Sequence, residues 1–452
     1  MSNYVSAFEH LAPVHTQADG SFPAAQDDGS WQSTFRRVRW VDGSLHRRQQ
    51  AEWLDVGLDG LDRAISGPLA GLRVTELGGL GPVQFAAMVL ADLGADVIRV
   101  ERPERAPAPT QSFILKRGRR SLALDLKNPS AKSIALDLIS RSAVVIEGWR
   151  PGVAERLGLG PSDCHARNPN LVYGRLTGWG QTGPYAQMAG HDVNYVAVSG
   201  VLSTLGRSGA APPPPQSYIG DFGGGAMFLV AGVLAALRHV EVDGGRGQAV
   251  DAAMTEGAAT LAAGTFQLLA QGRVTSRGSN LLDGGAPHYN VYECSDGRYV
   301  SVGAIEPKFY ELLREALGLH DSRWDDQNDQ SDWPARQAQL ERLFKTKSRE
   351  EWSELFARSD ACFAPVLELD EVPNDPHNNE RGSFVWCAGV LQPAPAPRFG
   401  DTPTSVRVPP PAAGEHSVEI LEELGYDAAS VHDFLATGAV VAHPGQSTHE
   451  PA

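Results

Sequence analysis

The chain has 452 residues, of which 42% are hydrophobic and 21% are charged, values typical of a globular protein with room for two or three domains. Its 54 Asp and Glu outnumber its 39 Lys and Arg, which gives a formal net charge of −15. This balance argues against nucleic acid or an anionic membrane as the main partner. An anionic ligand would therefore need a local basic patch.

The four cysteines lie far apart and form no C-x-x-C pair, which predicts free thiols and neither a disulfide framework nor a zinc site. The N-terminus lacks the basic-then-apolar pattern of a signal peptide, and the C-terminus is not a peroxisomal address. We also expect no stretch close to the ~20 apolar residues of a membrane span. Together these features predict a cytoplasmic protein.

Residues 1–65 show no sustained hydrophobic period, and we interpret them as an N-terminal extension whose role the sequence does not reveal. Residues 66–251 are different, because strand-like and helix-like segments alternate. "LRVTELG" alternates as a strand does, "GPVQFAAMVLADLGAD" has a helical period with Pro82 near its start, and "VIRVE" is a second strand. Such βαβ units predict a parallel sheet, and hence a large α/β domain over 66–251.

The pattern changes beyond this domain. We expect a linker over 252–290 and a smaller α+β domain over 291–377, which includes a hairpin turning at Asp296-Gly297 in "YNVYECSDGRYVSVGA". Residues 378–452 contain Pro-rich connectors and a last helix, "HSVEILEELGY", which we expect to return to the large domain.

The turn after the first strand of the large domain invites comparison with a dinucleotide site. Gly79 and Gly81 supply two of the three glycines in that fingerprint, and Glu101 stands where an acid is expected. Gln84, however, occupies the third position, where close helix–strand packing needs a small residue, and Pro82 removes a backbone N–H. We therefore expect a plain tight turn, no NAD and no separate cofactor.

A basic cluster follows, with eight Lys and Arg between residues 99 and 127 against three acids. In an acidic protein this excess is a candidate anchor for phosphates, although a solvated loop explains it equally well. The basic residues are Arg99, Arg102, Arg105, Lys116, Arg117, Arg119, Arg120 and Lys127.

Four acidic or basic residues, at three places near expected helix starts, are candidates for acid–base chemistry. His191 and Asp192 are adjacent in "AGHDVNYVAVSG", Asp221 precedes "FGGG", and Glu306 precedes Pro307. Taken singly, each is explained as a helix cap or helix-start acid.

Several blocks of the chain together carry a resemblance to the class III CoA-transferase (CaiB/BaiF) superfamily, and within it to the racemases of 2-methylacyl-CoA thioesters. The resemblance runs from about Gly67 to the C-terminal helix and leaves out residues 1–65. The blocks are "PLAGLRVTELGGLGPVQFAAMVLADLGADVIRVERP", "WRPGVAERLGLGP", "YGRLTGWGQTGP", "AGHDVNYVAVSG", "IGDFGGGAMFLVAG", "LDGGAPHYNVYEC" and "VGAIEPKFY".

The resemblance implies a Rossmann-like large domain, a smaller α+β domain and an interlocked-ring homodimer. It also implies an acyl-CoA ligand that is itself the substrate. By position, the CoA contacts match Arg102, Arg117, Arg120, Lys127 and Arg156. The catalytic groups of the racemases match His191, Asp221 and Glu306, and Asp192 matches the aspartate that is acylated in the transferases.

From these residues we expect inversion of the α-carbon of a 2-methylacyl-CoA by proton transfer through an enolate. His191 and Asp221 are then the two bases, Glu306 orients His191, and the N–H of Asp192 binds the enolate oxygen. The alternative is CoA transfer through an acyl anhydride on Asp192. His191 favours the racemase, because that position is generally small or apolar in transferases; His288 and Cys294 are interpreted as structural.

Overall fold

The computed structural model describes residues 35–37, 54–56, 66–103 and 114–443, and the chain divides into two compact units, 1–61 and 62–452. In the first unit, strand β1 (Phe35–Arg37) pairs antiparallel with β2 (Leu54–Val56). Most of the predicted N-terminal extension lies outside the described residues, so its role and its boundary stay predictions.

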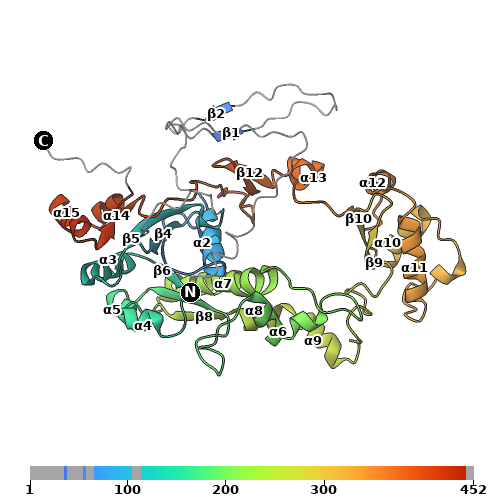
Figure 1. Cartoon of the computed structure of the whole chain (residues 1–452), viewed down its shortest axis with the longest axis horizontal. Coiled ribbons are helices and arrows are strands. Elements are labelled where there is room, and N and C mark those ends of the chain that lie inside the picture. Colours follow the sequence, from blue (N-terminus) through green and yellow to red (C-terminus); the bar gives the residue numbers. More distant parts are fainter. Residues whose placement is uncertain (1–34, 38–53, 57–65, 104–113, 444–452) are drawn as a thin grey trace. The chain divides into compact units, whose positions relative to one another are not determined.

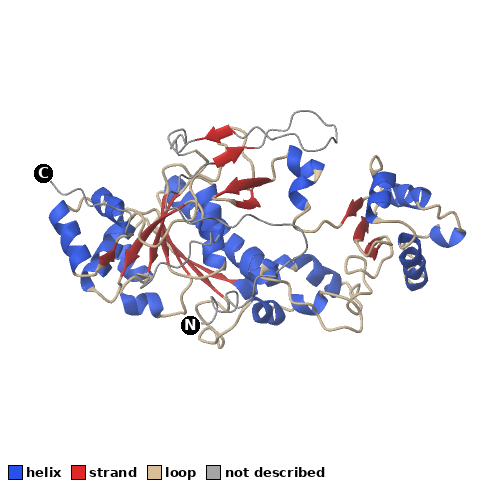
Figure 2. Cartoon of the chain, turned by 45° about the horizontal axis from the view of Figure 1, so that its top comes forward, coloured by secondary structure: helices blue, strands red, loops and turns tan. Residues whose placement is uncertain are grey.

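A seven-stranded sheet forms the centre of the second unit, in the order β14-β5-β4-β3-β6-β7-β8 (Figures 1 and 2). Six strands are parallel, and β14 joins β5 antiparallel at one edge. The predicted α/β class is therefore confirmed, and the parallel strands follow the doubly wound order of Rossmann domains. The strands are β3 (Arg73–Leu77), β4 (Asp96–Glu101), β5 (Arg119–Leu124), β6 (Val144–Glu147), β7 (Val172–Thr177), β8 (Ala249–Ala253) and β14 (Val440–Val441).

Helices cover both faces of this sheet and form two apolar cores. One core packs α2 and α7 against the strands, and the other packs α3, α5, α14 and α15. The helices of this part are α2 (Pro82–Asp92), α3 (Pro129–Ser140), α4 (Val153–Leu157), α5 (Pro161–Arg167), α6 (Asp192–Val198), α7 (Met227–Asp243), α8 (Met254–Leu261), α9 (Ala263–Ala270), α14 (Ser417–Glu423) and α15 (Ala428–Ala436). Short 3₁₀ turns are η2 (Ile114–Lys116) and η3 (Val201–Thr204), and a π-helix, η4 (Tyr218–Ala226), runs directly into α7.

The continuous helix Tyr218–Val242 corrects one expectation from the sequence. By length and composition it could cross a membrane, with a mean hydropathy of 1.6, so the expectation that no stretch reaches this length is wrong. Half of its apolar window is buried within the protein. Leu229 and Val233, one turn apart on the same face of the helix, are fully buried in the core against the sheet, which accounts for the apolar composition of that face.

A three-stranded antiparallel sheet, in the order β11-β10-β9, forms a separate core with its own helices. The hairpin predicted at Asp296-Gly297 is confirmed, since Glu293 pairs with Tyr299 across it. We call this part the small domain. Its elements are β9 (Tyr289–Glu293), β10 (Tyr299–Gly303), α10 (Pro307–Ala316), η5 (Ser322–Trp324), α11 (Trp333–Phe344), α12 (Arg349–Phe356) and β11 (Phe363–Pro365).

The chain then returns to the seven-stranded sheet. After η6 (Val372–Asn374) and α13 (Pro376–Glu380), strands β12 (Phe384–Cys387) and β13 (Val390–Pro393) form a hairpin. Ile420 and Leu421 of α14 are buried in the core of the sheet, and β14 pairs with β5. The exact domain limits set out from the sequence stay predictions.

Candidate active site

The His191–Asp192 pair stands at the start of α6, and its two residues differ in environment. His191 is the exposed residue that precedes the helix, and its backbone N–H donates to Asn194 Oδ1 at 3.0 Å. Asp192 is the first helical residue and only 5% exposed. Its Oδ1 accepts a hydrogen bond from the backbone N–H of Asp221 at 2.7 Å. The Asp192 carboxylate therefore connects α6 to another segment instead of capping its own helix.

Asp221 lies in the π-helix η4, which widens the turn that begins the long central helix. π-helical turns are rare and are frequently found at functional sites. Asp221 is 7% exposed, so it and Asp192 form a buried pair of carboxyl groups. The structure thus brings together two predicted site residues that are 29 positions apart in the chain.

The environment of Asp221 favours its protonated form. Burial, and then the negative charge of Asp192, raise the pKa of the Asp221 carboxyl to about 6, while a hydrogen bond with Ser217 lowers it. A carboxyl with such a pKa both accepts and donates a proton near neutral pH, as an acid–base catalyst must. Sequence reasoning missed Ser217, because a serine in "PPPPQSY" carries no signal of this contact.

Close backbone contact between η4 and α8 holds Asp221 in place. A Cβ on Gly257 of α8 would lie 1.8 Å from the carbonyl oxygen of Gly224, and one on Gly224 would lie 2.5 Å from the N of Ala258. Only glycine allows the two helices to approach so closely. Gly224 of "GDFGGG" therefore serves the close packing of η4 on α8.

An aromatic cluster supports the loop that ends at His191. The ring of Trp179 makes edge contacts with Tyr185 and Tyr195, at centroid distances of 5.3 and 4.8 Å. The hydroxyl of Tyr195 donates to the carbonyl of Gly190, the residue before His191. The position of His191 thus depends on side chains on both sides of the loop.

Glu306 belongs to the small domain, whereas the other three predicted catalytic residues belong to the large sheet and its helices. It is exposed and immediately precedes α10, and its carbonyl accepts from the N–H groups of Phe309 and Tyr310. Its charge acts on the neighbouring Cys362 thiol, whose pKa is raised by burial and then by Glu306. The predicted contact of Glu306 with His191 stays a prediction.

The carboxyl ends of β3 and β6 mark the topological switch point of this sheet, the place at which Rossmann domains bind dinucleotides. Here the turn after β3 packs against protein. A Cβ on Gly78 would lie 2.6 Å from Nε1 of Trp149, and one on Gly79 would lie 3.0 Å from Cβ of Val83. Gln84 is buried beneath this turn and donates to the carbonyl of Gly79 at 3.4 Å. These contacts fit the plain turn expected from Gln84.

The basic cluster separates into exposed and paired side chains. Arg102, Lys127 and Arg156 are exposed, as phosphate contacts must be. Arg117 is 2% exposed, and its guanidinium binds both carboxylate oxygens of Asp92 at 2.6 and 3.1 Å and Gln392 at 2.8 Å. This enclosure argues against the CoA contact expected of Arg117, because no face of the guanidinium is open.

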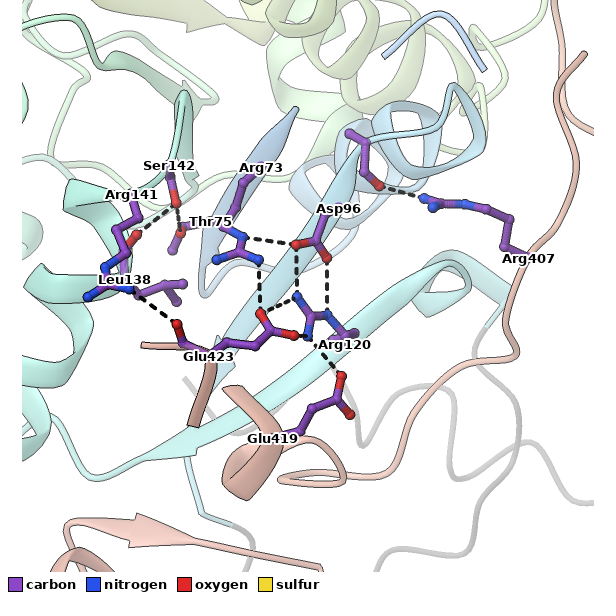
Figure 3. Close-up of polar contacts among 11 residues, drawn as sticks. Arg73, Thr75, Asp96, Arg120, Leu138, Arg141, Ser142, Arg407, Glu419 and Glu423 are labelled. Atoms are coloured by element: carbon purple, nitrogen blue, oxygen red, sulfur yellow. Dashed lines mark hydrogen bonds and ion pairs between the residues drawn. The ribbon is translucent and has the colours of Figure 1, made fainter. Parts of the chain in front are cut away.

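Arg120 likewise holds the returning chain (Figure 3). It binds Asp96 of β4 at 2.8 and 3.1 Å, and Glu419 and Glu423 of α14 at 3.0 and 2.5 Å. Arg73 joins the same cluster through Asp96 and Glu423, both at 2.9 Å. These contacts fasten α14 to the sheet, and the CoA contact expected of Arg120 stays a prediction.

This chain resembles known proteins of one family in both sequence and structure. A sequence model of CoA-transferase family III matches residues 69–417. The chain is 43% identical to α-methylacyl-CoA racemase of Mus musculus, over 79% of this chain and 93% of that protein, and 43% identical to the Homo sapiens protein of the same name, over 80% and 95%. The crystal structure of a CaiB/BaiF family protein from Brucella suis superposes with a TM-score of 0.69 at 26% identity, covering 79% of this chain and all of that one.

Within the part of the chain that the structure describes, no group of three or more His, Cys, Asp and Glu side chains is arranged to hold a metal ion.

Proposed function

Because this chain belongs to CoA-transferase family III, we propose that it inverts the α-carbon of 2-methylacyl-CoA thioesters. Two relatives named for this activity support the proposal, each matched over most of its length. The observation that carries it is the buried Asp221 carboxyl, whose pKa of about 6 suits proton exchange, in a residue whose backbone N–H donates to Asp192, the chain neighbour of His191. An acid–base pair at one site suits 1,1-proton transfer.

The reaction needs one base on each side of the α-carbon. In one direction His191 removes the α-proton, the electrons move to the thioester oxygen as an enolate, and Asp221 returns a proton to the opposite face. In the other direction the two residues exchange roles. The backbone N–H of Asp192, in the first turn of α6, is free of helical acceptors and is our donor for the enolate oxygen. The chemistry is thus assigned to this chain's own groups, and CoA is part of the substrate.

We place Glu306 next to His191 in a homodimer of interlocked rings, with the small domain of one copy facing the large domain of the other. Glu306 would then accept a hydrogen bond from the second ring nitrogen of His191 and raise its basicity. Exposed apolar side chains around α6, η4, α8 and α9 support such an interface. They are Val193, Val198, Tyr218, Leu261, Phe266 and Leu269.

Arg102, Lys127 and Arg156 are our candidates for binding the CoA phosphates. All three are exposed, and they supply local positive charge in a protein of formal net charge −15. We also propose that the protein is cytoplasmic and that neither nucleic acid nor a membrane is its partner.

CoA transfer through an anhydride on Asp192 is the second candidate. A nucleophilic carboxylate must reach the thioester carbonyl. Asp192 is 5% exposed, its Oδ1 is bound to the N–H of Asp221, and its Oδ2 is buried. These contacts favour the racemase, because the carboxylate would have to leave them before it could attack.

The test incubates wild-type protein in D2O with the R and S forms of a 2-methylacyl-CoA and follows the α-proton by NMR. We expect deuterium to enter the α-carbon of both forms, with inversion. Asp221→Asn should abolish inversion but let His191 exchange the proton of one form, and His191→Ala should show the mirror pattern. Passage of labelled CoA to a free acid without α-deuteration would instead establish the transferase.

A further inference from the structure

The Asp192 side chain has no role in the proton transfers proposed above, which use only its backbone N–H. Its Oδ2 is buried and has no hydrogen-bond partner among the described residues. Burying a carboxylate oxygen without a partner costs free energy, more so beside a second carboxyl group. Such a costly arrangement calls for a function that an apolar or amide side chain would not supply.

Two neighbours act on the Asp221 carboxyl in opposite senses. The negative charge of Asp192 favours the protonated form, and the hydrogen bond with Ser217 favours the ionised form. Ser217 is held in the left-handed region, with φ of 65°, directly before η4, and Gln216 before it has φ of 55°. Two consecutive non-glycine residues in this region are strained, so the surrounding structure must fix Ser217 in place.

The other charged groups near η4 lie on the elements packed against it, α2, α7, α8, β7 and β8. Among the described residues of these elements and of α6, Asp192 is the one whose charge contributes to the protonation of Asp221. The remaining charged or titratable groups on them are Asp92, Tyr173, Arg175, Tyr195, Arg238, His239, Glu241, Asp251 and Glu256, with Tyr218 on η4 itself.

We propose that the Asp192 side chain is a positioning residue that fixes the Asp221 backbone through Oδ1 and keeps a proton on the acid–base pair through its charge, with Ser217 as the opposing contact. This inference rests on the proposed function. It differs from both other roles considered for Asp192, the oxyanion N–H and the acylated carboxylate.

The activity of a two-base racemase depends on how many protons its two bases carry. In either direction the active free enzyme carries one proton between its two bases, and it is inactive when both are protonated or both are ionised. The pH profile of kcat/KM is therefore bell-shaped, and its limbs belong to the pair. A change in the proton affinity of Asp221 moves the limb that Asp221 controls.

The experiment compares this profile, measured by α-proton exchange, in the wild type and three variants. Asp192→Asn retains an Oδ1 acceptor for the Asp221 N–H but removes the charge, so it should move the Asp221 limb to lower pH by about one unit. Ser217→Ala removes the hydrogen bond and should move the same limb to higher pH. Glu256→Gln removes an exposed charge on α8 and should leave both limbs in place.

Opposite shifts in Asp192→Asn and Ser217→Ala support the inference, since damage to the fold would not move one limb in two directions. Unmoved limbs, or shifts of the same sign, would overturn it. Should Asp192→Asn not fold, Asp192→Ser removes the same charge in a smaller side chain that still has an oxygen acceptor, and its Asp221 limb should likewise move to lower pH. A wild type that exchanges no α-proton refutes the proposed function itself, so the two failures are distinguishable.

Discussion

Replacing Arg117 with Met separates a structural arginine from a CoA contact. The guanidinium makes four hydrogen bonds, to both oxygens of Asp92, to Gln392 and to the carbonyl of Pro393 at 2.7 Å. Arg117→Met leaves Asp92 buried without its cation. Burial already raises the pKa of Asp92, although Arg117 opposes it. Removing one partner of a buried ion pair costs about 3–5 kcal/mol, so we expect a loss of folding free energy of that size.

The assay pairs denaturant unfolding at pH 7 with the KM for a 2-methylacyl-CoA. Arg117→Met should lower the free energy of unfolding with little effect on KM, and adding Asp92→Leu should restore much of it, because the uncompensated charge is removed. The matched control is exposed Arg156→Ala, which should raise KM about tenfold and change stability little. If Arg117→Met kept the stability of the wild type but raised KM, the structural role given to Arg117 would be refuted, and Arg117 would count as a CoA contact.

Two further predictions concern stability. His288 is 1% exposed, its ring nitrogens have no hydrogen-bond partner among the described residues, and burial, then the charge of Arg336, lowers its pKa to about 4. The folded state therefore takes up this proton less readily than the unfolded state. As the pH falls from 6.5 to 4, the free energy of unfolding of the small domain should drop by about 3 kcal/mol. Urea titrations should show this drop in the wild type and not in His288→Phe. Gly257→Ala should destabilise by more than about 3 kcal/mol in thermal melts, because its Cβ would lie 1.8 Å from Gly224 O. By contrast, Gly264→Ala on α9, with open space around it, should be neutral or slightly stabilising, and equal effects of the two changes would contradict the close packing of η4 on α8.

The sequence predicts the large sheet well, because the spacing of apolar residues along each segment reflects which of its side chains are buried. "LRVTELG" and "VIRVE" alternate as strands do, and the structure places them side by side as β3 and β4. The hairpin at Asp296-Gly297 is also predicted from neighbouring residues, because its signal is a turn dipeptide between two alternating segments. The close approach of η4 to α8 is not predictable in this way, because it brings Gly224 against Gly257, 33 positions later in the chain, and no local pattern records such a contact.

Charge is harder to interpret than hydrophobicity, since the partner of a charged residue can lie anywhere in the chain. Arg117 and Arg120 stand in the run "KRGRR", which is typical of a phosphate-binding loop. Their partners Gln392 and Glu423 are 275 and 303 positions away. The run therefore identifies a basic segment but not which of its side chains remain open to a ligand.

The buried carboxyl groups single out the site without reference to any relative. Five Asp or Glu of the described residues are buried, and three are neutralised by arginine: Glu76 by Arg99 and Arg119, Asp92 by Arg117, and Glu147 by Arg175. The remaining two, Asp192 and Asp221, lie next to each other, with the Asp221 backbone N–H donating to Asp192 Oδ1. A fold selected for stability alone would give them a cation or replace them, as it does elsewhere in the same domain. An uncompensated carboxyl pair beside an exposed histidine persists where a proton must be held loosely, and that requirement is the one that racemisation imposes.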